Sequence, residues 1–388
     1  MIALFVIMAI ALCFIFYAMV GYPVFLLILE KIKKPNECSH DYSYQPQVSY
    51  MIVAHNEEKS IRMKLENILS FDYPLNKIQI IVASDNSTDA TNDLVSEFAA
   101  VHPELNILLH ITKEHKGKTN AQNEAHKKAT GELLVMTDAN TVVEKNAVTE
   151  LVTSFTDEKI VYVCGKLVYT NSDANASSDS ESTYWSLDLK MRDIESRIQT
   201  ITAGNGALYA CRTNEYVDLN PIFCHDLTMP YIYAKQKKKA LFCPTAVAYE
   251  KAGESNKDEF KRKVRMNRDL LTSVSNGFKS FNVFKYKWFS VFYFGHRTCR
   301  YLLWFYHLCF FVCGALLSIY MPIFGAALTL AQFIWISLSA VAIKKEIKFM
   351  PLRLVSYYGI AILAQFVGVY RIVTGKAKPI WEKAESTR

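Results

Sequence analysis

Long uncharged stretches lie at both ends of the chain, and a mixed region lies between them. The first stretch, Ile2 to Leu29, holds 28 consecutive residues without a charged side chain, whereas about 20 residues are enough for a helix to cross a bilayer. Three lysines follow it by position 34. Because basic residues mark the cytoplasmic end of a span, residues 1–30 are predicted to form a transmembrane helix that leads into the cytoplasm. A cleaved signal peptide is the alternative, but the first five residues lack the basic start of such a signal.

The second uncharged stretch, Tyr301 to Ile343, is 43 residues long and is interrupted by Pro322. At about 20 residues for each crossing, it is long enough for two helices. A third stretch, Leu354 to Tyr370, has 17 residues between two arginines. It is either a third span or a buried or interfacial helix, because both of its flanks are basic. Residues 301–373 are therefore predicted to form two to three transmembrane helices, followed by a basic tail at 374–388.

Residues 279–300, directly before these spans, combine aromatic and basic side chains. The aromatic residues Phe281, Phe284, Trp288, Phe289, Phe292 and Tyr293 alternate with lysines and arginines. A basic, aromatic-rich amphipathic segment beside a span is typical of a helix in the lipid headgroup layer. Residues 279–300 are predicted to form such an interfacial helix. The alternative is an ordinary core helix with one solvated face.

Between residues 47 and 165, short apolar runs alternate with helical patterns. Strands are expected at 48–54, 78–83, 106–111 and 133–136, and helices at 57–69, 88–100 and 119–129. This alternation predicts an α/β domain with a doubly wound parallel sheet. In such sheets, ligands bind at the carboxyl ends of the strands.

Polar residues follow each of the four predicted strands. The segments are His55-Asn56-Glu57-Glu58, Ser84 to Asp89, Lys113 to Thr119, and Thr137-Asp138-Ala139-Asn140. Carboxylates at three strand ends and lysines at the other suit an anionic ligand held partly through a divalent cation, because Mg²⁺ binds few protein oxygens together with phosphate oxygens. Neither a Walker A sequence nor a strand followed by G-x-G-x-x-G is present. A P-loop or nicotinamide site is therefore disfavoured.

Composition supports a charged domain joined to apolar spans. The 388 residues are 51% hydrophobic and 21% charged, which excludes collagen-like, disordered and small disulfide-framework classes. The net charge of +7 is local, because residues 251–300 contain 12 basic and four acidic residues. A local excess favours phosphate or lipid headgroups as partners over nucleic acid.

The nine cysteines contain no C-x-x-C pair. They therefore do not have the spacing of a zinc site or of a disulfide framework. A reducing compartment is expected for the soluble part.

In the order of its motifs, the chain resembles the membrane-bound inverting glycosyltransferases of family 2, in the branch that contains hyaluronan, chitin and cellulose synthases. The resemblance covers essentially the whole chain. The matching segments are residues 53–58, 82–89, 116–123, 137–140, 204–209, 225–226 and 262–266. It implies a GT-A, Rossmann-like fold inserted between an N-terminal transmembrane helix and C-terminal transmembrane helices, with residues 45–275 as the cytoplasmic catalytic domain.

The resemblance also implies how the donor is bound. The residues expected to bind the nucleotide or substrate are Ala54, His55, Glu57, Asp85, Lys118, Asp138, Gly204, Asn205 and Arg262. The donor is expected to be a nucleotide-diphosphate sugar, usually a UDP-sugar. Asp138 and Asn140 stand at the family's D-x-D position, where Mg²⁺ or Mn²⁺ bridges the diphosphate.

For catalysis, the resemblance assigns Asp226 as the general base on the acceptor hydroxyl and Arg265 as the cation over the leaving diphosphate. These residue types suit the reaction, since an inverting transfer needs a base and positive charge on the departing phosphates. Arg also pairs bidentately with phosphate.

The sequence departs from the family's pattern at four positions. Ser84 replaces the first Asp of a D-D-G-S pair, and Asn140 replaces the second acidic residue of D-x-D. Met266 stands where the Q-x-x-R-W motif has the Trp that lines the acceptor end. His225, before the predicted base, either tunes Asp226 or is a packed histidine. These departures leave open the metal affinity and whether the enzyme is processive.

The resemblance implies transfer of sugars to a growing polysaccharide, coupled to its export, at the plasma (inner) membrane of the cell with the catalytic domain in the cytoplasm. One alternative is the addition of a single sugar to a lipid-linked or oligosaccharide acceptor. Another is a non-catalytic nucleotide sensor, which the retained Asp138 and Asp226 disfavour. A channel or transporter alone is disfavoured because its spans would be few and uncharged. The donor sugar, the acceptor, the linkage and the oligomeric state are left open by the sequence.

Overall fold

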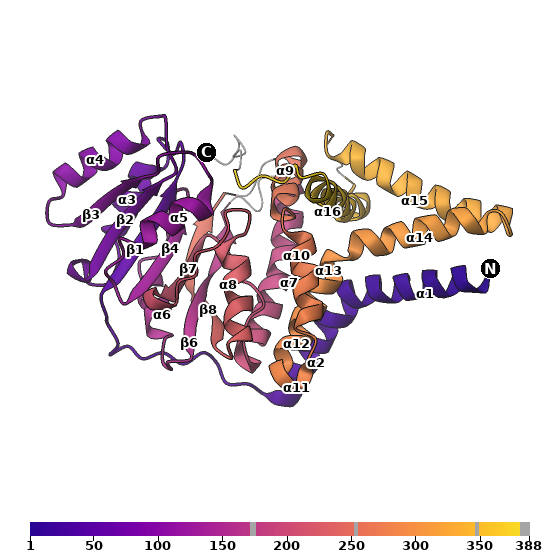
Figure 1. The fold of residues 1–388 in the computed structure, drawn as a ribbon, viewed down its shortest axis with the longest axis horizontal. Coiled ribbons are helices and arrows are strands. Elements are labelled where there is room, and N and C mark those ends of the chain that lie inside the picture. The colour runs from indigo at the N-terminus through magenta and orange to yellow at the C-terminus, as the bar shows by residue number, and fades with distance from the viewer. Residues whose placement is uncertain (171–175, 252–254, 346–348, 381–388) are drawn as a thin grey trace.

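The central domain is built on one mixed β-sheet. The computed structural model describes residues 1–170, 176–251, 255–345 and 349–380, and over these residues the sheet has eight strands in the order β3-β2-β1-β4-β7-β6-β8-β5 (Figure 1). The strands are β1 (Val48–Ala54), β2 (Ile78–Ser84), β3 (Asn106–Ile111), β4 (Leu133–Asp138), β5 (Val142–Val143), β6 (Ile160–Tyr169), β7 (Leu208–Arg212) and β8 (Lys239–Glu250).

The four strands predicted from the alternating pattern form the parallel half of this sheet. β1 pairs in parallel with β2 and β4, and β2 pairs in parallel with β3. Every residue of β1 is buried, as expected for a central strand that is covered on both faces. The prediction of a parallel α/β sheet is confirmed for this half. β7 then joins β4 in the antiparallel direction, so the complete sheet is mixed.

Helices cover both faces of the sheet. One face packs against α3 (Ile61–Ile68), α4 (Thr91–Val101) and α6 (Ala147–Thr153), and the other against α5 (Lys118–His126) and α8 (His225–Lys235). The helices α3 and α4 begin three to four residues later than the sequence predicts. The residues before α3 and α4 form turns instead of helix. The two turns contact each other, because the backbone N–H of Glu57 donates to the hydroxyl of Thr91, at the start of α4, at 2.7 Å.

A layer of helices separates the sheet from the apolar ends of the chain (Figure 1). Its members include α2 (Tyr22–Lys33), α7 (Ala176–Ile198), α9 (Asn256–Met266) and α10 (Leu270–Lys279). Within this layer, Tyr22 and Leu26 of α2 pack against Met191 and Ile194 of α7. Short turns elsewhere are the 3₁₀ segments Leu75–Lys77 and Thr213–Glu215.

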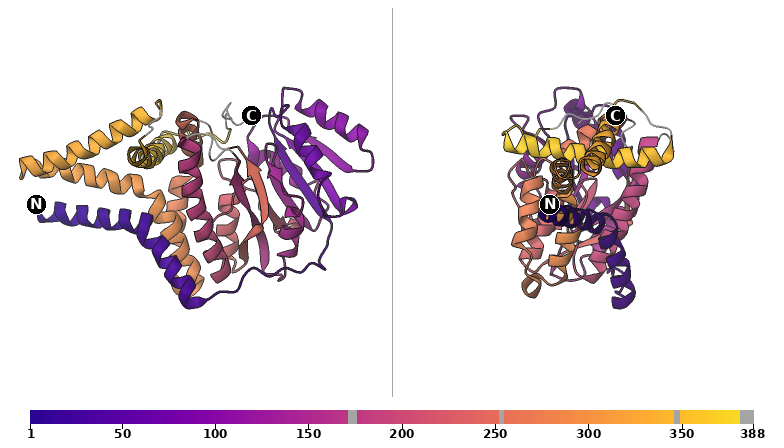
Figure 2. Two further views of the ribbon diagram at one scale, coloured as in Figure 1. Left: turned by 180° about the vertical axis from the view of Figure 1, so that it is seen from behind. Right: turned by 90° about the vertical axis from the view of Figure 1, so that its right-hand side faces the viewer.

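Three helical stretches are long and apolar enough to cross a membrane among the described residues: Ile2–Lys33, Pro322–Ala342 and Pro351–Val373. The first consists of α1 (Ile2–Phe16), a π-helical turn (Tyr17–Gly21) and α2. A bent pair, Trp288–Tyr301 and Leu303–Leu317, meets at 52° and would be a fourth span if it crossed as one unit. Figures 1 and 2 show α1, α14 (Leu303–Leu317) and α15 (Pro322–Ala342) extending together away from the sheet.

The helix α16 (Met350–Val373) is oriented differently from these three. Figure 1 shows it end on, whereas α14 and α15 run across the view. It packs against α9 and α10 of the central domain, where the Tyr357 hydroxyl donates to Glu259 at 3.3 Å. The end of the predicted tail, residues 381–388, lies outside the described residues.

Residues 279–300 do not form the single helix that the sequence predicts. They form α11 (Val283–Tyr286), α12 (Trp288–Phe292), a π-helical turn (Tyr293–Thr298) and α13 (Cys299–Tyr301). The break has a local cause, because Lys287 adopts φ 56° between α11 and α12, and a non-glycine residue in this conformation ends a right-handed helix. Phe284 of α11 is nevertheless fully exposed.

Candidate functional site

The ends of three parallel strands bring the predicted polar residues to one edge of the sheet. Ala54 at the end of β1 is paired with Ser84 of β2, and Val53 is paired with Asp138 of β4. Residues 55, 85 and 138 therefore lie next to one another at the ends of β1, β2 and β4. This is the edge at which ligands bind in open α/β sheets.

Asp85 is the centre of a cluster of polar side chains beside β1. Its carboxylate is fully buried and accepts hydrogen bonds from the backbone N–H of Gly117 at 2.7 Å and of Lys116 at 3.1 Å. His115 contacts the same carboxylate at 2.7 Å. The ring of His55 stacks on His115 with centroids 3.8 Å apart, and its Nδ1 lies 2.7 Å from the carbonyl oxygen of Asp85. Two stacked rings over a buried carboxylate can bind a planar base and a hydroxyl-bearing group.

Ala54 and Glu57 lie beside this cluster. The carbonyl of Ala54 accepts from the backbone N–H of Asp85 at 2.8 Å. The carboxylate of Glu57 is buried and accepts from the hydroxyl of Ser60 at 2.7 Å. Asn56 and Asn86, beside them, both have φ 53°, which allows the two loops to turn sharply as they leave the strands.

Lys118, Asp138 and Asp226 converge at Gly206. The Nζ of Lys118 pairs with Asp138 and lies 3.2 Å from the carbonyl oxygen of Gly206. A Cβ added to Gly206 would lie 3.0 Å from Lys118 Nζ, 3.8 Å from Asp226 Oδ2 and 3.9 Å from Asp138 Oδ2. Four predicted motifs, far apart in the sequence, therefore meet within a few ångströms.

The two carboxylates and the ammonium in this group influence one another. Burial raises the pKa of Asp226, Lys118 lowers it and Asp138 raises it further. For Lys118, burial acts to lower the pKa, but Asp138 and Asp226 outweigh it and the pKa is raised. The ammonium group of Lys118 therefore keeps its proton more readily than that of an ordinary lysine, and Asp226 holds a proton more readily than an ordinary aspartate. This is the direction that a general base requires.

The loop formed by Gly204, Asn205, Gly206 and Ala207 (the 204–207 loop) contacts both Asp226 and Lys118. The backbone N–H of Gly204 donates to the carbonyl of Asp226 at 2.7 Å. The side chain of Asn205 faces the protein, donating to Gly165 O at 2.7 Å and accepting from the N–H of Ala207 at 3.1 Å. Gly204 and Asn205 were predicted to bind substrate, and in the structure these polar groups bind Asp226, Gly165 and the backbone of the loop.

Glu250 and Lys64 belong to the same region and were not predicted. Glu250, at the end of β8, accepts from the Thr141 hydroxyl at 2.5 Å, and its pKa is raised by burial and by the nearby charge of Asp138. Lys64 of α3 is fully buried and donates to Thr141 O at 2.8 Å, and burial lowers its pKa to about 7. Since both come from elements with no motif spacing to Asp138, the sequence offered no signal for them.

Asn140 lies two residues beyond Asp138 and is partly exposed. Its amide oxygen, the Asp138 carboxylate and the nearby Glu250 carboxylate are all hard oxygen donors. Such a set suits Mg²⁺ or Mn²⁺, which prefer oxygen ligands. Because the Asp138 and Glu250 carboxylates repel each other, a cation bound near both would also reduce this repulsion.

Three arginines of α9 and the following turn border the site. Arg262 donates to Glu259 at 2.7 and 3.0 Å. Arg265 is close enough to Asp138 for their charges to interact, although burial and Arg262 lower its pKa. Arg268, not singled out from the sequence, donates to Phe223 O at 3.2 Å and to Cys224 Sγ at 3.0 Å, next to Asp226. The predicted basic excess is thus concentrated beside the carboxylates.

His225 is a packed histidine. Its Nδ1 lies 3.0 Å from Gln122 Oε1 and its Nε2 lies 3.1 Å from Val217 O, and burial lowers its pKa to about 3. The ring therefore stays neutral in a polar core contact. Of the two roles left open by the sequence, the packing role is the one that the contacts favour.

The end of the described chain returns to the site. Arg268 donates to the carbonyl of Pro379 at 2.9 Å, and the same oxygen would lie 2.7 Å from a Cβ added to Gly117. Gly117 also has φ 96°, so a side chain there would be both strained and blocked. The segment after α16 therefore lies beside Gly117, whose backbone N–H binds Asp85, a contact that no sequence pattern indicated.

Comparison with known proteins identifies relatives of the central domain. Residues 49–212 match the family model described as "Glycosyl transferase family 2". A protein of Bacillus subtilis named "Probable glycosyltransferase YdaM" is 38% identical over 131 residues, which are 33% of this chain and 31% of that protein. The hyaluronan synthase of Streptococcus pyogenes is 30% identical over 139 residues, 35% of this chain and 32% of the synthase. The chain thus spans about a third of the length of these relatives.

One solved structure is similar over nearly the whole chain. It is a mannosyltransferase of Pyrobaculum calidifontis in complex with GDP-mannose and Mn²⁺, with a TM-score of 0.71 and 21% identity. The match covers 95% of this chain and 99% of the mannosyltransferase. The likeness concerns the fold, and it extends beyond the sheet to the helices at both ends.

Proposed function

Because residues 49–212 form a glycosyltransferase domain of family 2 with the GT-A fold, we propose that this chain transfers a sugar from a nucleotide-diphosphate donor to an acceptor hydroxyl with inversion at the anomeric carbon. The observation that carries the proposal is the convergence of Lys118, Asp138 and Asp226 around Gly206. A cation and two carboxylates at one point of the sheet edge meet the needs of a leaving diphosphate and of an attacking hydroxyl.

Asp226 is the general base of this proposal. As the acceptor oxygen attacks the anomeric carbon, Asp226 takes the hydroxyl proton, and the bond from that carbon to the diphosphate breaks with its electron pair on the leaving oxygen. Its place at the first turn of α8 keeps the carboxylate in the site. Its raised pKa brings it nearer the operating pH, where a base is most effective.

Asp138 and Asn140 are proposed to hold a divalent cation, with Glu250 near enough to contribute. The oxygen donors fit Mg²⁺ or Mn²⁺, and the similar mannosyltransferase was solved with Mn²⁺. When bound, such an ion neutralises the charge of the diphosphate. Lys118 pairs with Asp138 in the structure and is proposed to turn to the phosphates when donor binds.

Ala54, His55, Glu57 and Asp85 are proposed to bind the nucleoside. The stacked rings of His55 and His115 offer a flat surface for the base, and the buried Asp85 carboxylate can accept from ribose hydroxyls. A UDP-sugar is the expected donor. The relative solved with GDP-mannose makes a GDP-sugar the first alternative to test.

Arg265 is proposed to stabilise the leaving diphosphate. Its guanidinium is within electrostatic reach of Asp138, and planar guanidinium groups pair with phosphate oxygens in two parallel hydrogen bonds. Arg262, which is held by Glu259, is placed one turn earlier on α9 and would contribute positive potential to the same region. Gly204 and Asn205 are proposed to act by shaping the loop under the reacting groups.

The membrane arrangement is also a proposal. We propose that the central domain lies in the cytoplasm, against the inner face of the plasma membrane, and the lysines that follow residue 30 support this orientation. α1, α14 and α15 extend in one direction and would cross the bilayer, whereas α16 lies crosswise and packs on α9 and α10. We therefore expect α16 to lie along the interface. The exposed Phe284 and its neighbouring lysines would sit in the headgroup layer.

The acceptor is proposed to be a growing polysaccharide, on the similarity to hyaluronan synthase. A second candidate, the addition of one sugar to a lipid-linked acceptor, is favoured by Met266, because the Trp that lines the acceptor end in polymerising relatives is replaced here. Both candidates use the same donor site and the same base.

Product length with purified, lipid-reconstituted protein distinguishes the two. Radiolabelled UDP- and GDP-sugars are offered singly and in pairs, with membrane lipid extract as the acceptor source. A ladder of products supports polymer synthesis, and one labelled lipid species supports single addition. If no donor is consumed above the level of Asp226→Asn, the proposed function is wrong.

A further inference from the structure

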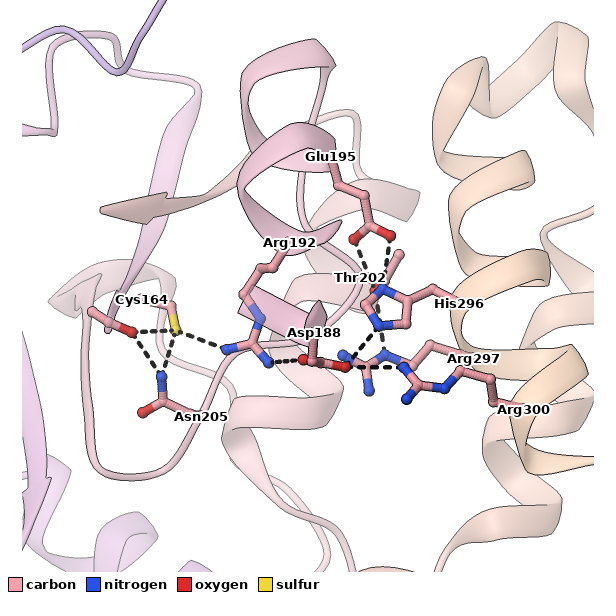
Figure 3. Close-up of polar contacts among 10 residues, drawn as sticks. Cys164, Asp188, Arg192, Glu195, Thr202, Asn205, His296, Arg297 and Arg300 are labelled. Carbon is pink, nitrogen blue, oxygen red and sulfur yellow. Dashed lines mark hydrogen bonds and ion pairs between the residues drawn. The ribbon is translucent and has the colours of Figure 1, made fainter. Parts of the chain in front are cut away.

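A buried ion cluster joins the membrane-proximal helices to the central domain. Figure 3 shows Asp188 and Glu195 of α7 facing His296, in the π-helical turn Tyr293–Thr298, and Arg300, in α13, with Arg192 of α7 on the other side of Asp188. Asp188, Glu195 and His296 are almost completely buried. The proposed reaction uses none of these residues, although buried charges are costly unless they are paired.

On its membrane side, the cluster is held together by His296. Its Nε2 lies 2.9 Å from Asp188 Oδ1 and its Nδ1 lies 2.7 Å from Glu195 Oε1. Because a carboxylate only accepts, both ring nitrogens donate and the ring is an imidazolium. Arg300 donates to the same Asp188 oxygen at 3.0 Å. The hydroxyl of Tyr22, on the N-terminal helix, donates to Glu195 at 2.6 Å, so both apolar ends of the chain meet at α7.

On its other side, the cluster reaches the sheet through Arg192. This side chain is fully buried and donates to Asp188 Oδ2 at 2.8 Å and to the sulfur of Cys164 at 3.7 Å. Asn205 donates to the same sulfur at 3.1 Å. Arg192, Cys164 and Asn205 therefore form a continuous line of contacts from α7 to the 204–207 loop (Figure 3).

Two further contacts hold Thr202, which precedes the 204–207 loop in the sequence. The Thr202 hydroxyl donates to Glu195 at 3.2 Å and accepts from Arg297 Nε at 3.2 Å. The loop is thus fixed at Thr202 and at Asn205 by groups that also hold the membrane-proximal helices. The loop also contacts the proposed catalytic groups, through Gly204 to Asp226 and through Gly206 to Lys118, and it is held further by Gly165 and Thr137.

We propose that this ion cluster positions the 204–207 loop for catalysis and makes that position depend on the seating of the membrane-proximal helices. Arg192, Asp188 and His296 are positioning residues, since they act on the base through the loop and touch no reacting atom. Displacing the loop by about 1 Å would move Asp226 relative to the acceptor, which costs on the order of 10- to 100-fold in rate.

The test compares Arg192→Gln with Arg197→Gln in the full-length protein in lipid nanodiscs. Arg197 lies five residues further along α7 and also pairs with two carboxylates, Glu30 and Asp193, but those contacts do not lead to the loop. Two quantities are measured: hydrogen–deuterium exchange of the peptide that contains residues 202–208, and kcat and KM for the donor. Cys164→Ala is a further variant, because it interrupts the same line without leaving an unpaired charge.

Faster exchange of the loop in Arg192→Gln and Cys164→Ala, with kcat lowered roughly tenfold or more and the donor KM within about twofold of wild type, supports the inference. Wild-type exchange and kcat in both variants would overturn it. Equal effects in Arg197→Gln would also overturn it, because they would reflect general loosening of α7. The activity arm rests on the proposed function. A wild-type protein without transferase activity contradicts that function, and the exchange comparison then decides the positioning role alone.

Discussion

The backbone N–H of Gly204 donates to the carbonyl oxygen of Asp226 at 2.7 Å. This bond joins the loop beneath the site to the first turn of α8, which carries the proposed base. Gly204 has no room for a side chain, because a Cβ there would lie 2.1 Å from the hydroxyl of Tyr162. The position of the base thus depends on a backbone contact as well as on its own helix.

Replacement of Asp226 by Asn is expected to remove the base while keeping the shape of the side chain. The predicted loss in kcat is about 100- to 10,000-fold, the range for a general base. Donor affinity, measured by calorimetry, should change little, because the proposed role of Asp226 is to act on the acceptor hydroxyl. A variant that retained more than about half of the wild-type kcat would contradict the assignment.

The acid limb of the pH profile should reflect Asp226. Its pKa is raised, so the ionised, basic form is complete only above that raised value and is lost as the pH falls through it. The fall in kcat/KM is therefore expected at a higher pH than for an ordinary aspartate, whose pKa is about 3.9. Asp269, whose pKa burial raises to about 6, supplies the control. If Asp269→Asn abolished the limb, Asp226 would not be its source.

Asn140→Asp should tighten metal binding. The change adds a second carboxylate two residues from Asp138 and restores the acidic D-x-D pair, and Mg²⁺ and Mn²⁺ bind more tightly as the ligand charge increases. After EDTA treatment, the Mn²⁺ concentration for half-maximal activity should fall several-fold, by roughly 1 kcal/mol of binding free energy. Asp138→Asn should shift it in the opposite direction. Full activity of the wild type in EDTA would exclude the metal role.

Gly206→Ala should lower kcat without unfolding the protein. The new Cβ would lie 3.0 Å from Lys118 Nζ and within 3.9 Å of both carboxylates, so it would occupy space between the three reacting groups. We expect a loss of about 10- to 100-fold in kcat. The melting temperature, read by intrinsic fluorescence, serves as the control. An unchanged kcat would show that the convergence point is not where the reaction takes place.

Arg265→Gln should slow the departure of the diphosphate by about 100-fold, the usual effect of removing one donor to a developing charge. Arg265→Lys keeps the charge but loses the planar fork, so its kcat should lie between those of Gln and Arg. A donor whose leaving diphosphate has a lower pKa should reduce the difference. Equal kcat values for Lys and Gln would indicate that charge at this position does not matter.

The sheet edge could be predicted because its signals are local in the sequence. A parallel strand followed by polar residues places those residues at the carboxyl edge, whatever lies elsewhere in the fold. Residues 55, 85 and 138 each follow such a strand, and the structure aligns them through the pairing of β1 with β2 and β4. The apolar stretches could also be predicted, since their length alone makes them candidates for membrane spans.

The interfacial segment shows the limit of such patterns. Residues 279–300 have an amphipathic composition, but the left-handed backbone of Lys287 divides them into short helices. A periodic pattern indicates which side chains are apolar, but it does not indicate where tertiary packing bends the backbone.

The four parallel strands, the polar residues that follow them and the two apolar ends of this protein could be predicted from the sequence, because these features depend on spacing along the chain. Tertiary structure alone decided which distant groups share a space. Glu250 beside Asp138, Pro379 beside Gly117, and the line from His296 through Arg192 to Asn205 are contacts between segments separated by tens to hundreds of residues. The physical reason is that charge pairing and burial act through space, and only the packed fold sets those distances.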